Sequence, residues 1–387
     1  AEATLGLEFA IDGDPENLAQ VFAVGPVVRA DEVLANLVLR DADGAGDPEA
    51  VVVRNVSTQA LAEVRDYATG NPLASLASTP GYPPVDADLV SHFAGTAADE
   101  LAILLFDPGF DRPLVEVRDT LSDQRLARVP FNRAHRPVAL AVLPDPTPVL
   151  AVLANRRSDG RPRVLLRDLA TGEALPTLSL PGGFAVTDLR VAPDFSGNGQ
   201  AEVLVLARRT RDDKGFVLVW DTGGAGWLAN LPVPRGYTPL DLGFAYGPGE
   251  APSVAILTRR EAGGTARLFF NDALTGARIW TRGWNRAPVA LDTLILPGET
   301  DGIGVLTQRL TDQTPILSLM ESDTNAIGAN VSFGTGVTGL DFLVLPDLSV
   351  DPGTDGELSV LVRTATGLEL RVRDAATKNL IQTITIP

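Results

Sequence analysis

The chain has 387 residues, 45% of them hydrophobic, and a formal net charge of −17 at neutral pH. So acidic a chain argues against binding nucleic acid, because a phosphate backbone is recognised by a basic stripe. The absence of cysteine excludes disulfides, thiolate metal sites and a cysteine nucleophile. No apolar run approaches the ~20 residues of a membrane-spanning helix.

A block of about fifty residues recurs seven times along the chain. Each copy contains four short apolar strands, and a turn follows the third strand. The third strands end at Asp66, Asp119, Asp168, Asp221, Asp272, Ser322 and Asp374. Such a period indicates repeated units that bury their faces against their neighbours. We therefore expect an all-β, seven-bladed β-propeller of four-stranded antiparallel blades over residues 31–387.

Residues 1–30 do not fit the full unit and resemble half of one, a β-hairpin or strand extension. Seven units are complete without them, so three roles stay open for this extension. It closes the ring, forms part of an eighth blade, or pairs with the strand edge of another subunit. Ring closure is the favoured role. The start at Ala1 fits what remains after signal-peptide removal, which predicts a secreted or cell-surface protein, with the periplasm as an alternative.

The first two strands of each unit are largely apolar, as expected of strands covered on both faces. The first strands are expected at Ala35–Leu39, Ala87–Ser91, Val138–Leu143, Thr187–Ala192, Leu240–Ala245, Leu291–Leu296 and Leu340–Leu345. The second strands are expected at Ala50–Arg54, Glu100–Phe106, Val149–Asn155, Glu202–Arg208, Ser253–Thr258, Gly302–Gln308 and Glu357–Arg363. The fourth strand is short and variable, as over Ala174–Leu180.

The loop between the first two strands is the candidate metal site. In the fourth unit, Asp194, Ser196, Asn198 and Glu202 occupy positions 1, 3, 5 and 9, with Gly199 at position 6. Alternate oxygen-bearing side chains in a tight loop converge on one point, which suits Ca²⁺. The alternative is that Asp, Asn, Ser and Gly simply make good turns.

The first and seventh loops also carry oxygen ligands. The candidate ligands are Asp41, Asp43, Asp47 and Glu49 in the first loop, and Asp347, Ser349, Asp351 and Asp355 in the seventh. On these three loops the sequence resembles the integrin-type FG-GAP/VCBS repeat family. That resemblance implies a seven-bladed propeller in which some blades hold Ca²⁺ between their first two strands. The other four loops depart from this pattern.

The turn after the third strand reads Asp-x-x-Thr-Gly at Asp66, Asp168 and Asp272. The copy that runs from Asp272 to Trp280 resembles the tryptophan-docking motif of quinoprotein-type propeller repeats. In those repeats the motif is structural, so we expect these turns to serve the scaffold. Arginines also recur at the end of the second strand, and they either form an anion-binding ring or pair with nearby acids. They are Arg54, Arg156, Arg208, Arg259, Arg309 and Arg363.

No nucleophile or acid–base pair stands out, so the sequence predicts no catalytic residues, no organic cofactor and no enzymatic activity. We expect a secreted binding or assembly module with a protein partner or self-association, in an adhesion-like or appendage role. One alternative is a Ca²⁺-dependent lyase or hydrolase that acts on an anionic substrate, such as a polysaccharide, in the central pocket. Another is a filament subunit that polymerises through residues 1–30.

Overall fold

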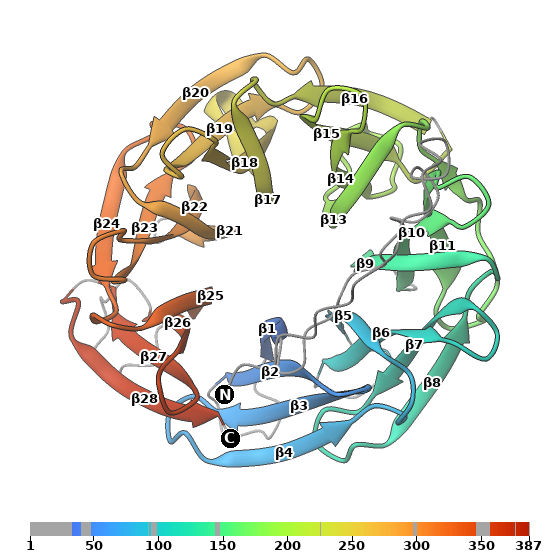
Figure 1. Ribbon diagram of the computed structural model, residues 1–387, viewed down its shortest axis with the longest axis horizontal. Coiled ribbons are helices and arrows are strands. Elements are labelled where there is room, and N and C mark those ends of the chain that lie inside the picture. The colour runs from blue at the N-terminus through green and yellow to red at the C-terminus, as the bar shows by residue number, and fades with distance from the viewer. Residues whose placement is uncertain are drawn as a thin grey trace, which may run out of the picture.

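The computed structural model describes residues 33–39, 48–91, 93, 99–143, 148–224, 226–296, 300–345, 357–375 and 377–386. Seven four-stranded sheets surround a central channel (Figure 1), which confirms the predicted seven-bladed β-propeller. The blades are numbered 1 to 7 in chain order. Within each blade consecutive strands pair antiparallel, with the first strand at the channel and the fourth at the rim. The extension over residues 1–30 lies outside the described residues.

Blades 1 to 4 occupy the first part of the described chain. Blade 1 contains β1 (Val33–Leu39), β2 (Glu49–Val56), β3 (Gln59–Asp66) and β4 (Pro72–Ala77). Blade 2 contains β5 (Pro84–Val90), β6 (Glu100–Asp107), β7 (Arg112–Arg118) and β8 (Arg125–Pro130). Blade 3 contains β9 (His135–Leu143), β10 (Val149–Arg156), β11 (Pro162–Asp168) and β12 (Leu178–Ser179). Blade 4 contains β13 (Phe184–Ala192), β14 (Glu202–Arg209), β15 (Lys214–Asp221) and β16 (Gly226–Pro232).

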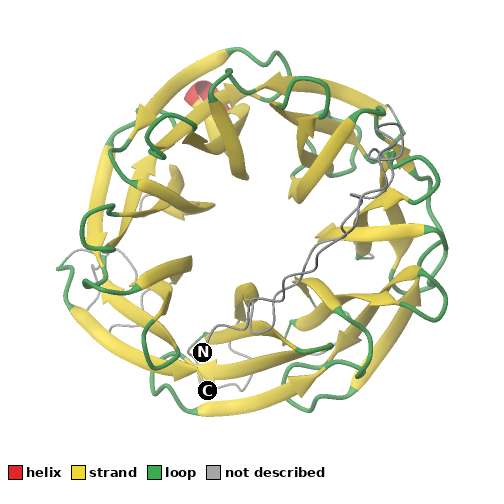
Figure 2. Ribbon diagram, in the orientation of Figure 1, coloured by secondary structure: helices red, strands yellow, loops and turns green. Residues whose placement is uncertain are grey.

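Blades 5 to 7 complete the ring. Blade 5 contains β17 (Tyr237–Gly247), β18 (Ala251–Arg260), β19 (Ala266–Asp272) and β20 (Arg278–Gly283). Blade 6 contains β21 (Ala287–Leu296), β22 (Thr300–Gln308), β23 (Pro315–Glu321) and β24 (Ile327–Ser332). Blade 7 contains β25 (Thr338–Leu345), β26 (Glu357–Arg363), β27 (Leu368–Asp374) and β28 (Leu380–Ile386). A single short 3₁₀ turn, η1 (Pro248–Glu250), interrupts the strands and turns of the described chain (Figure 2). No described helix is long and apolar enough to cross a membrane.

The hydrophobic core lies between the blades. Leu204 and Leu206 of blade 4, for example, pack in one cluster with Val254 and Ile256 of blade 5. Alternate residues of a strand point to opposite faces, and both faces of β14 are covered, so its apolar residues are almost completely buried. The continuous apolar pattern of the second strands is explained by this two-sided cover.

The first strands begin two to four residues earlier than predicted. Each has a register shift against the second strand near its start, as between Val186 and Asp188 in β13 and between Pro239 and Asp241 in β17. A bulge breaks the apolar pattern locally. The predicted strands therefore begin at or after the bulged residue.

The fourth strand of blade 3 is much shorter than the predicted Ala174–Leu180. Its ladder is reduced to β12 and an isolated bridge between Arg167 and Ala174. Pro176 lies between these two contacts and has no N–H to donate, so it interrupts the pairing.

The ring closes between blades 7 and 1 without a shared strand among the described residues. β1 to β4 form one sheet and β25 to β28 another. Side chains join the two blades in one apolar cluster, in which Val52 and Tyr67 of blade 1 meet Leu361 and Leu370 of blade 7. Among the described residues, this junction is made by the same kind of side-chain packing as the other six.

Candidate functional site

The central channel contains a cavity of about 900 Å³, lined mainly by the first strands of all seven blades. Its lining includes five aspartates and two arginines. The aspartates are Asp86, Asp88, Asp188, Asp241 and Asp341, and the arginines are Arg190 and Arg363. A sixth aspartate, Asp292, lies close enough to influence the pKa of Asp341. The cavity is therefore acidic.

The bulge in the first strands determines where these carboxylates lie. The first residue after the register shift is Asp86, Asp188, Asp241 or Asp341 in blades 2, 4, 5 and 7. Alanine occupies the same position in blades 1, 3 and 6. Each blade with alanine at this position directly follows a blade with aspartate there. The aspartate carboxylate therefore faces the space that the small alanine side chain leaves open in the next blade.

Three of the carboxylates accept hydrogen bonds from the backbone of the next blade. Asp86 accepts the backbone N–H of Leu140 in blade 3 at 2.8 Å, and Asp241 accepts that of Leu291 in blade 6 at 2.8 Å. Asp88 makes the same kind of bond, at 2.9 Å, to Val142. The other oxygen of each accepts the N–H of the following residue in its own strand. These side chains thus satisfy backbone donors at the inner ends of the blades.

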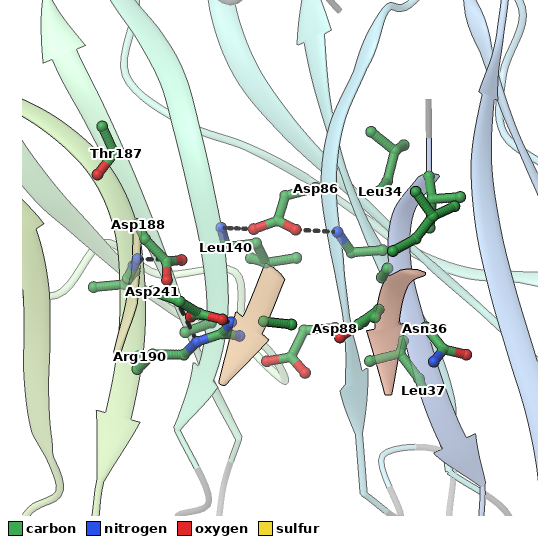
Figure 3. A pocket seen from close by; sticks show the side chains of 18 of the residues that line it. Leu34, Asn36, Leu37, Asp86, Asp88, Leu140, Thr187, Asp188, Arg190 and Asp241 are labelled. Atoms are coloured by element: carbon green, nitrogen blue, oxygen red, sulfur yellow. Dashed lines mark hydrogen bonds and ion pairs between the residues drawn. The ribbon is translucent and has the colours of Figure 1, made fainter. Parts of the chain in front are cut away.

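Arg190 is the guanidinium that partly neutralises the cluster. It lies 3.3 Å from Asp241 and 3.5 Å from Asp188, and Figure 3 shows the three side chains together on the β13 side of the channel. These carboxylates, with Asp188 first, raise the pKa of Arg190 well above its ordinary value. The positive charge is therefore held on the side of blades 4 and 5.

Protein walls surround the channel carboxylates, so their charged forms are poorly solvated. This desolvation raises the pKa of Asp86 and of Asp341 to about 7 and that of Asp292 to about 6. The pKa of Asp188 is also raised, because desolvation outweighs the attraction of Arg190. Near neutral pH the channel can therefore gain or lose protons.

The predicted metal loop of blade 4 is a tight turn around one carboxylate. Asp194 accepts the backbone N–H of Gly197, Asn198 and Gly199, and these bonds, with Gly199 first, lower its pKa. The hydroxyl of Ser196 lies 3.4 Å from the same carboxylate. The structure thus brings Asp194, Ser196 and the Asn198 backbone together.

The remaining two predicted ligands of this loop also bond to its backbone. Glu202 is fully buried and accepts the N–H groups of Phe195 and Ser196. The side-chain oxygen of Asn198 accepts the N–H of Gln200 at 2.9 Å. These contacts support the turn-forming role, and calcium binding here stays a prediction.

In the other two predicted loops, only Glu49 belongs to the described part of the chain, where it is 1% exposed at the start of β2. Asp41, Asp43, Asp47, Asp347, Ser349, Asp351 and Asp355 lie outside it. Among the described residues, no three or more His, Cys, Asp or Glu side chains are placed to hold a metal ion.

Calcium titration after chelator treatment tests all three loops. We expect heat on titration and a higher melting temperature; a ligand at 100 times its Kd stabilises the native state by about 2.7 kcal/mol. Asp194→Asn should reduce both signals, since it keeps an acceptor for the backbone but removes the charge. The exposed Asp323, for which the structure shows no hydrogen bond or ion pair, gives the control variant Asp323→Asn. No heat and no melting shift would rule the calcium sites out.

Half of the recurrent arginines at the ends of the second strands pair with local acids. Arg156, Arg208 and Arg309 form ion pairs with Asp159, Asp213 and Asp312, respectively. Arg363 lines the channel, where its side chain is also engaged in an interaction. The pairing alternative therefore accounts for three of the six.

The turns after the third strands have the predicted geometry. The carboxylate of Asp66 accepts the N–H of Thr69, and Gly70 has a φ of 72°. In blade 6 the turn starts at Glu321, one residue before the predicted Ser322, because Asn325 bonds back to the Glu321 carbonyl. The structure thus supports the scaffold role of the turn.

The single tryptophan of the docking-like motif joins two blades. The indole N–H of Trp280 donates to the Ser322 carbonyl of blade 6 at 2.8 Å. Its ring stacks on Phe270, with 4.6 Å between the ring centroids. The motif therefore contributes to packing between blades 5 and 6.

No protein-family model and no curated protein matches the sequence. Solved structures do match the fold. The chain is similar to BBS1N from its complex with ARL6DN, with a TM-score of 0.60 and 12% identity over 90% of this chain and 93% of that one. It is also similar to a Synechocystis apocarotenoid oxygenase mutant, with a TM-score of 0.52 and 11% identity over 92% of each chain.

A third similar structure is the β-propeller domain of the trilobed protease from Pyrococcus furiosus, which has an open velcro topology. Its TM-score is 0.50, with 11% identity over 89% of this chain and 93% of that one. Identities this low carry the fold and no activity, because one fold hosts unrelated functions. By architecture the chain is a seven-bladed β-propeller.

Proposed function

We propose that this chain is a non-catalytic binding or assembly module that holds a protein partner or further copies of itself. The observation that supports this best is the engagement of the channel carboxylates. Asp86, Asp88 and Asp241 accept N–H groups from neighbouring blades, so these carboxylates are already engaged in joining the blades. Such carboxylates suit a rigid scaffold.

The acidic channel and surface favour a positively charged partner surface. The lining has five aspartates against two arginines, and the whole chain carries a net charge of −17. An anionic substrate would meet repulsion in this cavity. The lyase or hydrolase alternative is for that reason not the function we propose. A secreted or cell-surface location belongs to the proposal, since an adhesion-like or appendage role requires one.

Sedimentation velocity over a range of concentrations tests the assembly role. We expect the full chain to form species larger than the monomer. A chain that begins at residue 31 should keep the β-sheet circular dichroism of the propeller, because all seven blades are complete within residues 33–386. Loss of assembly on this truncation would support the filament alternative. A full chain that is monomeric at every concentration would contradict self-association.

A lyase assay tests the absence of catalysis. The protein is incubated with polygalacturonate and Ca²⁺, and ultraviolet absorbance follows any unsaturated product. We expect no product above a boiled-protein control. Product formation that disappears in Asp241→Asn would contradict the proposal and support the enzyme alternative.

A further inference from the structure

The carboxylates on the side of blades 6 and 7 differ from the others in their partners. Among the described residues, Asp292 accepts a hydrogen bond only from Thr293 and Asp341 only from Phe342, each the next residue of its own strand. One oxygen of each therefore has no hydrogen-bond donor among the described residues. Arg190 forms its ion pairs with Asp188 and Asp241, and it acts on Asp292 and Asp341 only through its charge.

The register of the strands places these two carboxylates toward the next blade. Asp341 pairs across β25 and β26 with Leu361, which packs against blade 1. Asp292 pairs across β21 and β22 with Gly304, on the same face as Leu306, which packs against blade 7. Cross-strand partners share a face. The two carboxylates therefore face the junctions between blades 6 and 7 and between blades 7 and 1.

Asn36 is a second, independent indication of a ligand, at the junction between blades 7 and 1. It lines the channel on β1, is 4% exposed, and neither its side-chain oxygen nor its nitrogen has a hydrogen-bond partner. Blades 3 to 7 have a leucine or phenylalanine at the equivalent position, such as Leu140 and Phe342. Leaving such an amide buried and unpaired is unfavourable, because neither water nor protein replaces its hydrogen bonds.

Asn36 lies on the face of blade 1 that meets Asp341. It pairs with Val52, and Val52 packs in the same cluster as Leu361 of blade 7. The junction also contains a buried polar contact, since the Tyr67 hydroxyl lies 3.5 Å from Ser359 Oγ. The Asn36 amide, which is labelled in Figure 3, and the Asp341 carboxylate thus both line the cavity.

We propose that the channel wall that includes Asp341 and Asn36, with the Asp292 charge close by, binds the ammonium or guanidinium group of an elongated organic cation. Several N–H donors on one cation would satisfy the spare carboxylate oxygens and the Asn36 oxygen together. Arg190 shows that a guanidinium fits between carboxylates of this ring. A bare metal ion fits less well, since the described residues place no three acidic or histidine ligands around one point.

The cation is either a free polyamine or a lysine or arginine side chain of a partner. The second source rests on the proposed function, and the first stands without it. Spermidine and a tetralysine peptide are the two probes, titrated calorimetrically at low salt into the full chain. Tighter binding of spermidine supports the free amine, and tighter binding of tetralysine supports the partner side chain.

The double variant Asp292→Asn/Asp341→Asn removes two charges and no bond between blades. We expect it to weaken binding of the preferred probe at least about tenfold, because charge-assisted hydrogen bonds are the strong ones. The surface variant Asp323→Asn removes one charge away from the channel and should change the affinity less than about twofold.

Asn36→Leu separates binding from folding. This substitution should weaken binding of the probe and raise the melting temperature, because it replaces an unpaired buried amide by the apolar residue type that blades 3 to 7 have at this position. Equal affinities of the wild type and the double variant, or no binding by the wild type at millimolar probe, would overturn the proposal. Sedimentation of the same variants reports assembly separately, so unchanged assembly with lost probe binding leaves the proposed function intact.

Discussion

Lowering the pH from about 8 to about 5 should raise the melting temperature of this protein by several degrees. The channel carboxylates have a raised pKa in the native state, about 7 for Asp86 and Asp341. In the unfolded chain they titrate near the ordinary value of about 3.9. Since the native state binds more protons in this window, stability increases as the pH falls through 7 and 6.

The size of the effect follows from the same linkage. One group with a pKa of about 7 contributes roughly 2 kcal/mol between about pH 8 and pH 5, and less where channel water screens the charge. The gain ends near pH 4, because the unfolded carboxylates then become protonated too. Below about pH 4 the stability falls again. There, surface aspartates with a lowered pKa, such as Asp119 and Asp272, become protonated and lose the hydrogen bonds that favour their charged form.

Asp341→Asn isolates one part of this pH dependence. The charged groups that act on Asp341 are Asp241, Asp292 and Arg190, and its charge also acts on Tyr67. Asparagine keeps an acceptor for the Phe342 N–H and cannot ionise. We expect the variant to be more stable than the wild type at about pH 8 and nearly equal at about pH 5. Differential scanning calorimetry measures both, with Asp323→Asn as the control. A wild-type melting temperature that falls steadily from pH 8 to 5 would refute the assignment.

Glu116→Ala should destabilise the protein by about 3 to 5 kcal/mol, the usual effect of removing one partner of a buried ion pair. The Glu116 side chain is fully buried and lies 3.2 Å from Arg118, whose side chain is 10% exposed. It also accepts both the N–H and the hydroxyl of Thr79, in the segment that leads from blade 1 to blade 2. The alanine variant would lose these bonds and leave Arg118 with Asp123 alone.

Glu63 provides a matched control for this substitution. It occupies the equivalent position of blade 1, three residues before Asp66, as Glu116 precedes Asp119. Its contacts are weaker, at 3.9 Å to Arg65 and 3.4 Å to Ser75. Urea unfolding should show a much smaller loss for Glu63→Ala than for Glu116→Ala. Similar losses for the two variants would mean that the Glu116 network has no special weight.

The sequence repeat was sufficient to predict the blades, because each strand pairs with strands that are its neighbours in the sequence. Each unit forms its own sheet, so a pattern within about fifty residues contains the strands, the turn at Asp66 and the buried second strand. Strand starts were less accurate, since the bulge before residues such as Asp241 breaks the apolar run. Pro176 shortened a strand for a similarly local reason.

The channel cluster was not predicted, because its members come from five different blades. Asp86 and Asp341 are 255 positions apart and meet around one cavity only when the ring closes. The signal that could have revealed them is an acid inside an apolar strand, as at Leu240-Asp241-Leu242. An isolated carboxylate in a buried strand needs partners, and in a propeller those partners belong to the next blade.

The separate sheets of blades 1 and 7 have a mechanical consequence. When one strand is shared between the first and last blades, backbone hydrogen bonds resist a pull on the ring. Here tension applied between Val33 and Ile386 would act directly on the packing of residues such as Val52 and Leu361. Side-chain contacts can separate while strand ladders stay intact, so within the described residues a load would open the ring at this junction and leave the hydrogen bonds inside each blade in place.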